Sequence, residues 1–131
     1  EEFSKRLMNS LIKLLKQLTN RYNIRPEHVL GHLDVSHDRK DDPHHKFNWK
    51  LLSEEGFGLY PRVYSDNFSP CASSPLQRLL QFGYKCNSDA ELKSAIIAFN
   101  THFNPQSYHH NTVEIWTESS NIYLDDLLSQ L

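Results

Sequence analysis

Apolar residues recur at helical spacing along the first stretch of the chain, while lysines occupy the positions between them. The apolar positions are Phe3, Leu7, Leu11, Leu14, Leu15 and Leu18. Spacings of three and four residues are typical of a helix with one buried face. The pattern predicts a helix from about Ser4 to Arg21. Pro26 breaks it, because a residue that precedes proline avoids the α region.

A short apolar run and a polar stretch follow this helix. His28–His32 contains the apolar pair Val29 and Leu30, and we interpret it as a short buried strand with His32 at its C-terminal end. Functional residues often occupy that end of a strand. Residues 33–46 show no apolar periodicity and are expected to form a loop, after which a helical pattern starts at Phe47 and ends at Gly56.

The second half begins with residues 59–75, which contain three prolines and four serines and predict a linker on the surface. Three helices are expected beyond it. The first ends at Gly83, and the second opens on the capping box formed by Ser88 and Glu91. The third runs from Thr112 or Thr117 to Leu131. Together they predict a compact helical bundle.

Charge and cysteine content narrow the possible partners. Fourteen basic residues against 16 acidic ones, without a long run of one sign, argue against a nucleic-acid or anionic-membrane partner. The longest apolar runs are far shorter than the roughly 20 residues that a membrane span needs. Cys71 and Cys86 could pair across a loop of about 15 residues if the protein is exported, or stay free and partly buried in the cytoplasm.

The predicted loop carries the candidate chemistry. Residues 31–43 concentrate histidine and aspartate, which are zinc ligands in catalytic sites that use three protein ligands and leave one position open. Composition alone leaves two alternatives open. These residues are also common in exposed loops, and a single histidine after a strand is often structural.

The order of residues in this loop resembles a known family. Gly31-His-x-Asp-Val, then Arg39-Lys-x-Asp-Pro, then Phe47 and Trp49, is similar to the closing segment of zinc-dependent N-acetylmuramoyl-L-alanine amidases, relatives of the peptidoglycan recognition proteins. The similarity covers roughly residues 5–61. It implies an α+β chain, with the C-terminal half of a mixed α/β amidase domain in residues 1–61, a linker in 62–74, and a three-helix peptidoglycan-binding-like domain in 75–131.

The resemblance assigns roles to individual residues. His32 and Asp42 match zinc ligands, and Lys40 matches the cationic residue that faces the substrate carbonyl, where it would stabilise an oxyanion. Asp34 is expected to cap the turn or orient the loop, and Arg39 to pair with an acid. Trp49 is expected to form a core wall or to line the substrate cleft. The sequence departs from the family pattern at His37, where proline is usual, and at His44, where glycine is usual.

The same resemblance predicts an incomplete site. The family's other histidine ligand and its general-base glutamate would precede this sequence, which also starts without an initiator methionine. We therefore expect the chain to be inactive alone. It is either a C-terminal fragment that lacks the N-terminal part of the amidase domain, or a chain that another polypeptide completes. Its partner would be peptidoglycan or a muropeptide, in the periplasm or cell envelope, or in the cytoplasm if recycled anhydro-muropeptides are the substrate. The alternative is a non-catalytic muropeptide-binding module.

Overall fold

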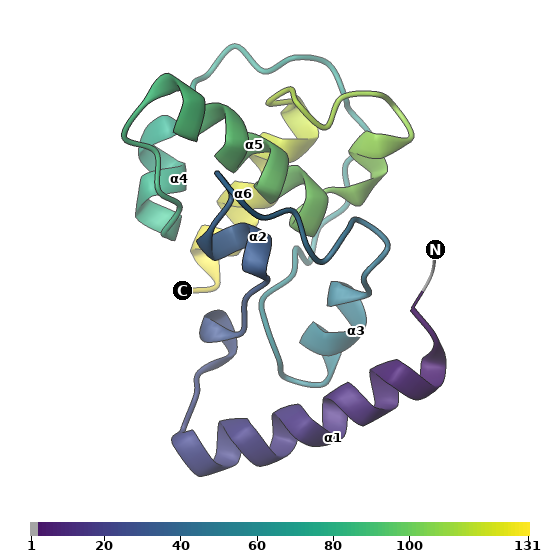
Figure 1. The fold of residues 1–131 in the computed structure, drawn as a ribbon. Helices are drawn as coiled ribbons and strands as arrows, with labels where there is room; N and C mark the ends of the chain where they lie inside the picture. Colours follow the sequence, from purple (N-terminus) through teal and green to yellow (C-terminus); the bar gives the residue numbers. More distant parts are fainter. Residues whose placement is uncertain (1–2) are drawn as a thin grey trace.

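The computed structural model describes residues 3–131, and this part of the chain is helical (Figure 1). In order, the elements are α1 (Lys5–Tyr22), η1 (Pro26–His28), α2 (His32–Val35), α3 (Trp49–Glu54), α4 (Leu76–Phe82), α5 (Asp89–Phe103), η2 (Pro105–Tyr108) and α6 (Glu118–Ser129). The described residues contain no strand, only an isolated bridge between Pro70 and Thr117. The predicted α+β class is therefore wrong for this chain.

The strand predicted at His28–His32 is replaced by two helical turns joined by an extended connection. His28 closes the 3₁₀ turn η1, and His32 is the first residue of α2. A strand needs a neighbouring strand to accept its backbone hydrogen bonds, and residues 3–131 supply none. The apolar run is also not buried, since Leu30 is 50% exposed.

The ends of the longer helices follow from side-chain caps. The Ser4 hydroxyl accepts the Leu7 N–H at the start of α1, and the Ser88 hydroxyl accepts the Glu91 N–H at the start of α5. Gly83 ends α4 with a φ of 120°, a left-handed conformation that glycine adopts without strain.

Caps also explain why two helices begin later than the first apolar residue of their pattern. The helix expected from Phe47 starts at Trp49, because the Asn48 side chain accepts the Leu51 N–H. The last helix starts at Glu118, because the Thr117 hydroxyl accepts the Ser120 N–H.

Only one flank of the apolar face of α1 is covered. Met8 and Ile12 are buried against α3, whereas Leu7 and Leu14 are about half exposed and Leu18 is 37% exposed. The prediction that this whole leucine face is buried was wrong. Figure 1 shows the reason: α1 lies apart from α4, α5 and α6, with α3 as its neighbour.

The buried side chains form two clusters. The smaller one joins α1 to α3 and centres on Trp49 and Leu52. The larger one lies among α4, α5 and α6, and it includes Leu33 from α2. Helix α2 is thus built into the core of the C-terminal helices, although it lies far from them in the sequence.

The segment between α3 and α4 runs along α6. The Tyr123 hydroxyl donates to the Ser65 carbonyl at 2.8 Å and accepts the Ser65 N–H at 3.0 Å, and the Asp126 carboxylate accepts the Arg62 N–H at 2.8 Å. Most of its side chains are exposed. The division into residues 1–61, 62–74 and 75–131 stays a prediction.

Two further expectations concern the whole described chain. Within residues 3–131, no helix combines the length and the apolar character that crossing a bilayer requires. Cys71 and Cys86 are both free thiols, so the disulfide considered from the sequence is not formed. Burial, followed by the nearby Glu91 charge, raises the pKa of the Cys86 thiol.

We predict that chymotrypsin cuts first within residues 59–75, where the Tyr64 side chain is 80% exposed. Tyr123→Phe removes both hydrogen bonds to Ser65 and should lower the free energy of local opening by about 1–2 kcal/mol. Cleavage should therefore accelerate roughly five- to thirtyfold under conditions where opening is at equilibrium. The measurement is limited proteolysis followed by mass spectrometry.

The control is Tyr22→Phe on exposed α1, which should leave the cleavage rate unchanged. First cuts outside residues 59–75, or equal rates for Tyr123→Phe and the unmodified chain, would contradict this prediction.

Candidate active site

A glycine positions the first candidate ligand. Gly31 precedes His32 as the N-terminal cap residue of α2, in a tightly packed spot. A Cβ atom at Gly31 would lie 2.6 Å from Leu33 Cδ2, 3.0 Å from Pro43 Cδ and 3.1 Å from Trp49 Cζ2. Because Gly31 has no side chain, Leu33, which follows His32, and Pro43, which follows Asp42, can both pack against it.

His32 and Asp42 lie next to each other, as two ligands of one metal must. His32 Nδ1 is 3.5 Å from Asp42 Oδ2, and the two side chains are 50% and 65% exposed. The backbone holds the two segments in register, because the Leu33 N–H donates to the Asp42 carbonyl at 2.8 Å. The loop between them turns at Ser36, whose carbonyl accepts the Arg39 and Lys40 N–H groups.

The two cationic candidates lie on this turn and are exposed. Arg39 donates to the Ser36 hydroxyl at 3.3 Å. Its expected acidic partner is absent among the ion pairs of residues 3–131. Lys40 lies two residues before Asp42 with its side chain in solvent, where a ligand could reach it.

Asp34 is the polar centre beneath the candidate ligands. It is 9% exposed, and its carboxylate accepts hydrogen bonds from the Gly31 N–H at 2.9 Å, from His102 Nδ1 at 2.7 Å and from the Tyr84 hydroxyl. Gly31 and Asp34 belong to α2 and its cap, whereas Tyr84 follows α4 and His102 lies on α5. One carboxylate thus ties the turn that bears His32 to the C-terminal helices.

Burial and hydrogen bonding shift the pKa of Asp34 in opposite directions. Burial raises the pKa of Asp34, but the attraction to His102 and the hydrogen bonds from His102, Tyr84 and the Gly31 backbone outweigh it, so that the pKa lies below its ordinary value. The pKa of Tyr84 is raised well above its ordinary value by burial and then by the Asp34 charge. Asp34 is therefore an ionised acceptor and Tyr84 a neutral donor at neutral pH.

Within residues 3–131, no third side chain of a metal-ligating type lies beside His32 and Asp42. No group of three or more histidine, cysteine, aspartate or glutamate side chains in that range could hold a metal ion. If His32 and Asp42 are the predicted ligands, they would supply two protein ligands, one fewer than catalytic zinc sites use.

Comparison with known proteins agrees with the resemblance of the loop. No protein-family model matches the chain. It is 34% identical over 114 residues to N-acetylmuramoyl-L-alanine amidase AmiD of Escherichia coli (strain K12), a match that covers 78% of this chain and 41% of AmiD. A solved structure of E. coli AmiD in complex with the substrate anhydro-N-acetylmuramic acid-L-Ala-D-gamma-Glu-L-Lys matches 98% of the chain with a TM-score of 0.84 and 28% identity.

The chain is related to the N-acetylmuramoyl-L-alanine amidases. A structure of AmpDH3 from Pseudomonas aeruginosa, in complex with anhydromuramic pentapeptide, also matches 99% of the chain, with a TM-score of 0.79 and 26% identity. These relatives are hydrolases that act on amide bonds. The chain spans 41% of the AmiD sequence, 53% of the AmiD structure and 55% of the AmpDH3 structure.

Within this amidase-related chain, Trp49 is a buried wall. Its ring is 5% exposed and stacks on the His102 ring at 3.9 Å between centroids. His102 stacks in turn on Phe103 at 3.7 Å. The stack runs from α3 to α5 directly beside the Asp34 carboxylate. A contact between Trp49 and substrate stays a prediction.

The two departures from the family pattern have partners in the structure. His37 Nδ1 lies 2.6 Å from the Ser94 hydroxyl on α5. The His44 ring packs against Phe3 with 4.9 Å between centroids, and the neighbouring His45 stacks on Tyr108 at 3.9 Å. Through His37 and His45, the loop contacts α5 and η2.

Sequence reasoning missed the two residues that hold Asp34. Tyr84 lies 50 residues after Asp34 and His102 lies 68 residues after it. Tyr84 follows a helix-ending glycine and His102 falls among apolar positions, a pattern that is typical of core residues in an ordinary bundle. No local signal relates either one to the loop.

We predict that Tyr84→Phe lowers the free energy of unfolding by about 1.5–3 kcal/mol at pH 7, because it removes a buried hydrogen bond to an ionised carboxylate. The folded-state pKa of Asp34 is depressed, so this contribution is complete above the unfolded value of about 4 and is lost as pH falls through the folded value. Urea unfolding should therefore give a smaller cost at about pH 2.5 than at pH 7.

Tyr108→Phe provides the matched control, because it removes a hydroxyl that hydrogen-bonds to the neutral Thr101 hydroxyl at 3.0 Å. Its cost should be about 0.5–1.5 kcal/mol at both pH values. If Tyr84→Phe cost the same at both pH values, the ionised role of Asp34 would be wrong.

Proposed function

We propose that this chain carries the His32 and Asp42 part of a zinc site in an enzyme that hydrolyses the amide between N-acetylmuramic acid and L-alanine in peptidoglycan or its fragments. The observation that carries the proposal is the 3.5 Å separation of His32 Nδ1 and Asp42 Oδ2 on an exposed surface. The relation to AmiD and AmpDH3 supports the reaction class.

The geometry of the pair fits zinc. Ligand bonds of about 2.0–2.2 Å at a tetrahedral angle place the two donor atoms about 3.4 Å apart. The observed separation is close to this value, so neither side chain needs to move far. Hydrogen bonding at the base of the loop, through Leu33 and Asp34, would keep both donors in place.

The chain also supplies a cation beside the ligands. When bound, zinc supplies a Lewis acid for the amide carbonyl and lowers the pKa of a water molecule. Lys40 would then present its ammonium group to the oxygen on which negative charge develops. Losing one such group typically costs about 10²–10³ in rate.

Residues 3–131 supply only part of the site that the proposed reaction needs. A third ligand and a general base would come from polypeptide outside the 131 residues, since residues 3–131 hold no third ligand near the pair. The exposed leucines of α1, Leu7, Leu14 and Leu18, offer an apolar surface on which that polypeptide could pack.

The substrate would be peptidoglycan or a muropeptide. Relatives of this chain bind anhydro-muramoyl peptides in solved structures. A location in the periplasm or cell envelope suits intact wall, and a cytoplasmic location suits recycled anhydro-muropeptides. Retention of both His32 and Asp42 favours an enzyme over a binding module without catalytic activity.

The test uses a longer protein that contains this chain. His32→Ala and Asp42→Ala should each abolish stoichiometric zinc, measured by inductively coupled plasma mass spectrometry, and abolish release of free peptide from a muropeptide. Lys40→Met should keep the zinc and lower kcat by about 10²–10³. The 131-residue chain alone should release no peptide.

Neighbouring residues give matched controls: Asp41→Ala and Lys46→Met change exposed residues of the same types and should leave zinc content and kcat unchanged. Full zinc content in Asp42→Ala would remove Asp42 from the ligand set. A muropeptide that binds to the longer protein but is never cleaved would favour the non-catalytic alternative.

A further inference from the structure

The net charge of −2 is unevenly distributed along the chain. Residues 3–24 contain five basic side chains and no acidic one, whereas residues 25–131 contain nine basic and 14 acidic ones, a balance of −5. The other two acids, Glu1 and Glu2, lie outside the described residues. The charge of the whole chain argues against an anionic partner, but the charge of this first segment favours one.

Most of these basic side chains lie on one face of α1. At 3.6 residues per turn, four of them fall within about 100° of the helix circumference. We call this set the basic face: Lys5, Arg6, Lys13 and Lys16, all of which are exposed. No acidic or aromatic side chain of α1 lies within this arc, and none of the four takes part in an ion pair among residues 3–131. The described part of the chain therefore leaves this charge open to an external partner.

The basic face is distinct from the exposed leucine flank of α1. Leu7 and Leu14 lie about 140° around the helix from the middle of the basic face. Met8 and Ile12, on a third side, are buried against α3. A polypeptide that packs on the leucines would therefore leave the basic face in solvent.

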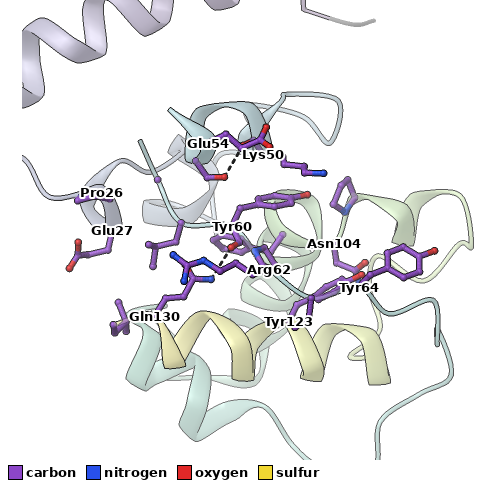
Figure 2. A pocket seen from close by; sticks show the side chains of 18 of the residues that line it. Pro26, Glu27, Lys50, Glu54, Tyr60, Arg62, Tyr64, Asn104, Tyr123 and Gln130 are labelled. Carbon is purple, nitrogen blue, oxygen red and sulfur yellow. Dashed lines mark hydrogen bonds between the residues drawn. The ribbon is translucent and has the colours of Figure 1, made fainter. Parts of the chain in front are cut away.

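Helix α1 lies at the edge of the molecule, apart from α4, α5 and α6 (Figure 1). Its 18 residues form a rod about 27 Å long, and the basic face extends over about 17 Å of this length. Charges of both signs meet elsewhere on the surface, since Lys50 and Arg62 share a cleft with Glu27 and Glu54 (Figure 2). Helix α1 differs from that cleft because its charges are all of one sign.

From these features we propose that the basic face of α1 binds the surface of a membrane that contains anionic phospholipids. Lysine and arginine side chains are attracted to the phosphate groups of such a surface, and each one strengthens binding by about fivefold. The attraction needs no pocket. It requires neither zinc nor cleavage and so goes beyond the proposed amidase function.

A membrane fits the basic face better than a nucleic acid does. Single-stranded nucleic acids are bound in basic grooves whose aromatic rings stack on the bases, whereas the basic face is a convex helix surface without an aromatic ring. An anionic membrane also repels the acidic balance of residues 25–131, so that the chain turns α1 toward the membrane.

The test is co-sedimentation of the 131-residue chain, without added metal, with vesicles of phosphatidylglycerol and phosphatidylcholine in equal parts. The chain should bind these vesicles but not vesicles of phosphatidylcholine alone. Raising the ionic strength from about 0.01 M to about 0.15 M shortens the Debye length from about 30 Å to about 8 Å and should release most of the bound chain. The double variant Lys13→Gln, Lys16→Gln should bind about thirtyfold more weakly, because two cations are lost while glutamine keeps a similar helix propensity.

The matched control is Lys85→Gln together with Lys93→Gln, which removes the same charge from exposed positions outside α1 and should leave vesicle binding nearly unchanged. Failure to bind the anionic vesicles, equal binding of neutral vesicles, or equal affinities of the two double variants would overturn the proposal. A chain that binds dissolved duplex DNA in preference to the anionic vesicles would also overturn it, in favour of a nucleic-acid partner.

Discussion

The buried carboxylate of Asp34 is the interaction on which the rest of the arrangement depends. It accepts hydrogen bonds from the backbone of Gly31, from Tyr84 and from His102, and so joins a four-residue helix to α5 and to the segment that follows α4. A single turn of helix is not stable alone. The turn that presents His32 therefore owes its position to the bundle, together with the burial of Leu33 in the bundle core.

This dependence gives the C-terminal helices a second role beside any binding of cell wall. His37 lies against Ser94, His45 stacks on Tyr108, and Trp49 stacks on His102, so the loop contacts α5 and η2 at several points. The loop that carries the proposed zinc ligands should therefore unfold together with the bundle and not independently of it.

The sequence predicted most of the helices, since caps such as Ser88 and breakers such as Gly83 act locally. The strand at His28–His32 was wrong because strands depend on partners, and residues 3–131 contain no strand to pair with it. Leucine spacing predicted α1 but not which flank is covered, because that depends on what packs against it.

For the candidate site, the order of residues around His32 and Asp42 predicted that both belong to one site. The structure places His32 Nδ1 and Asp42 Oδ2 3.5 Å apart. Tyr84 and His102 could not be linked to Asp34, since that contact exists only in the folded chain. Backbone hydrogen exchange measured by NMR tests the account most directly. The Leu33 N–H donates to the Asp42 carbonyl and the Ser36 N–H to the His32 carbonyl. The free energy of the opening that exposes these two amides should be nearly the same as that for the Phe99 amide in α5. Fast exchange of Leu33 and Ser36 while Phe99 stays protected would contradict it, because the loop would then open independently of the bundle.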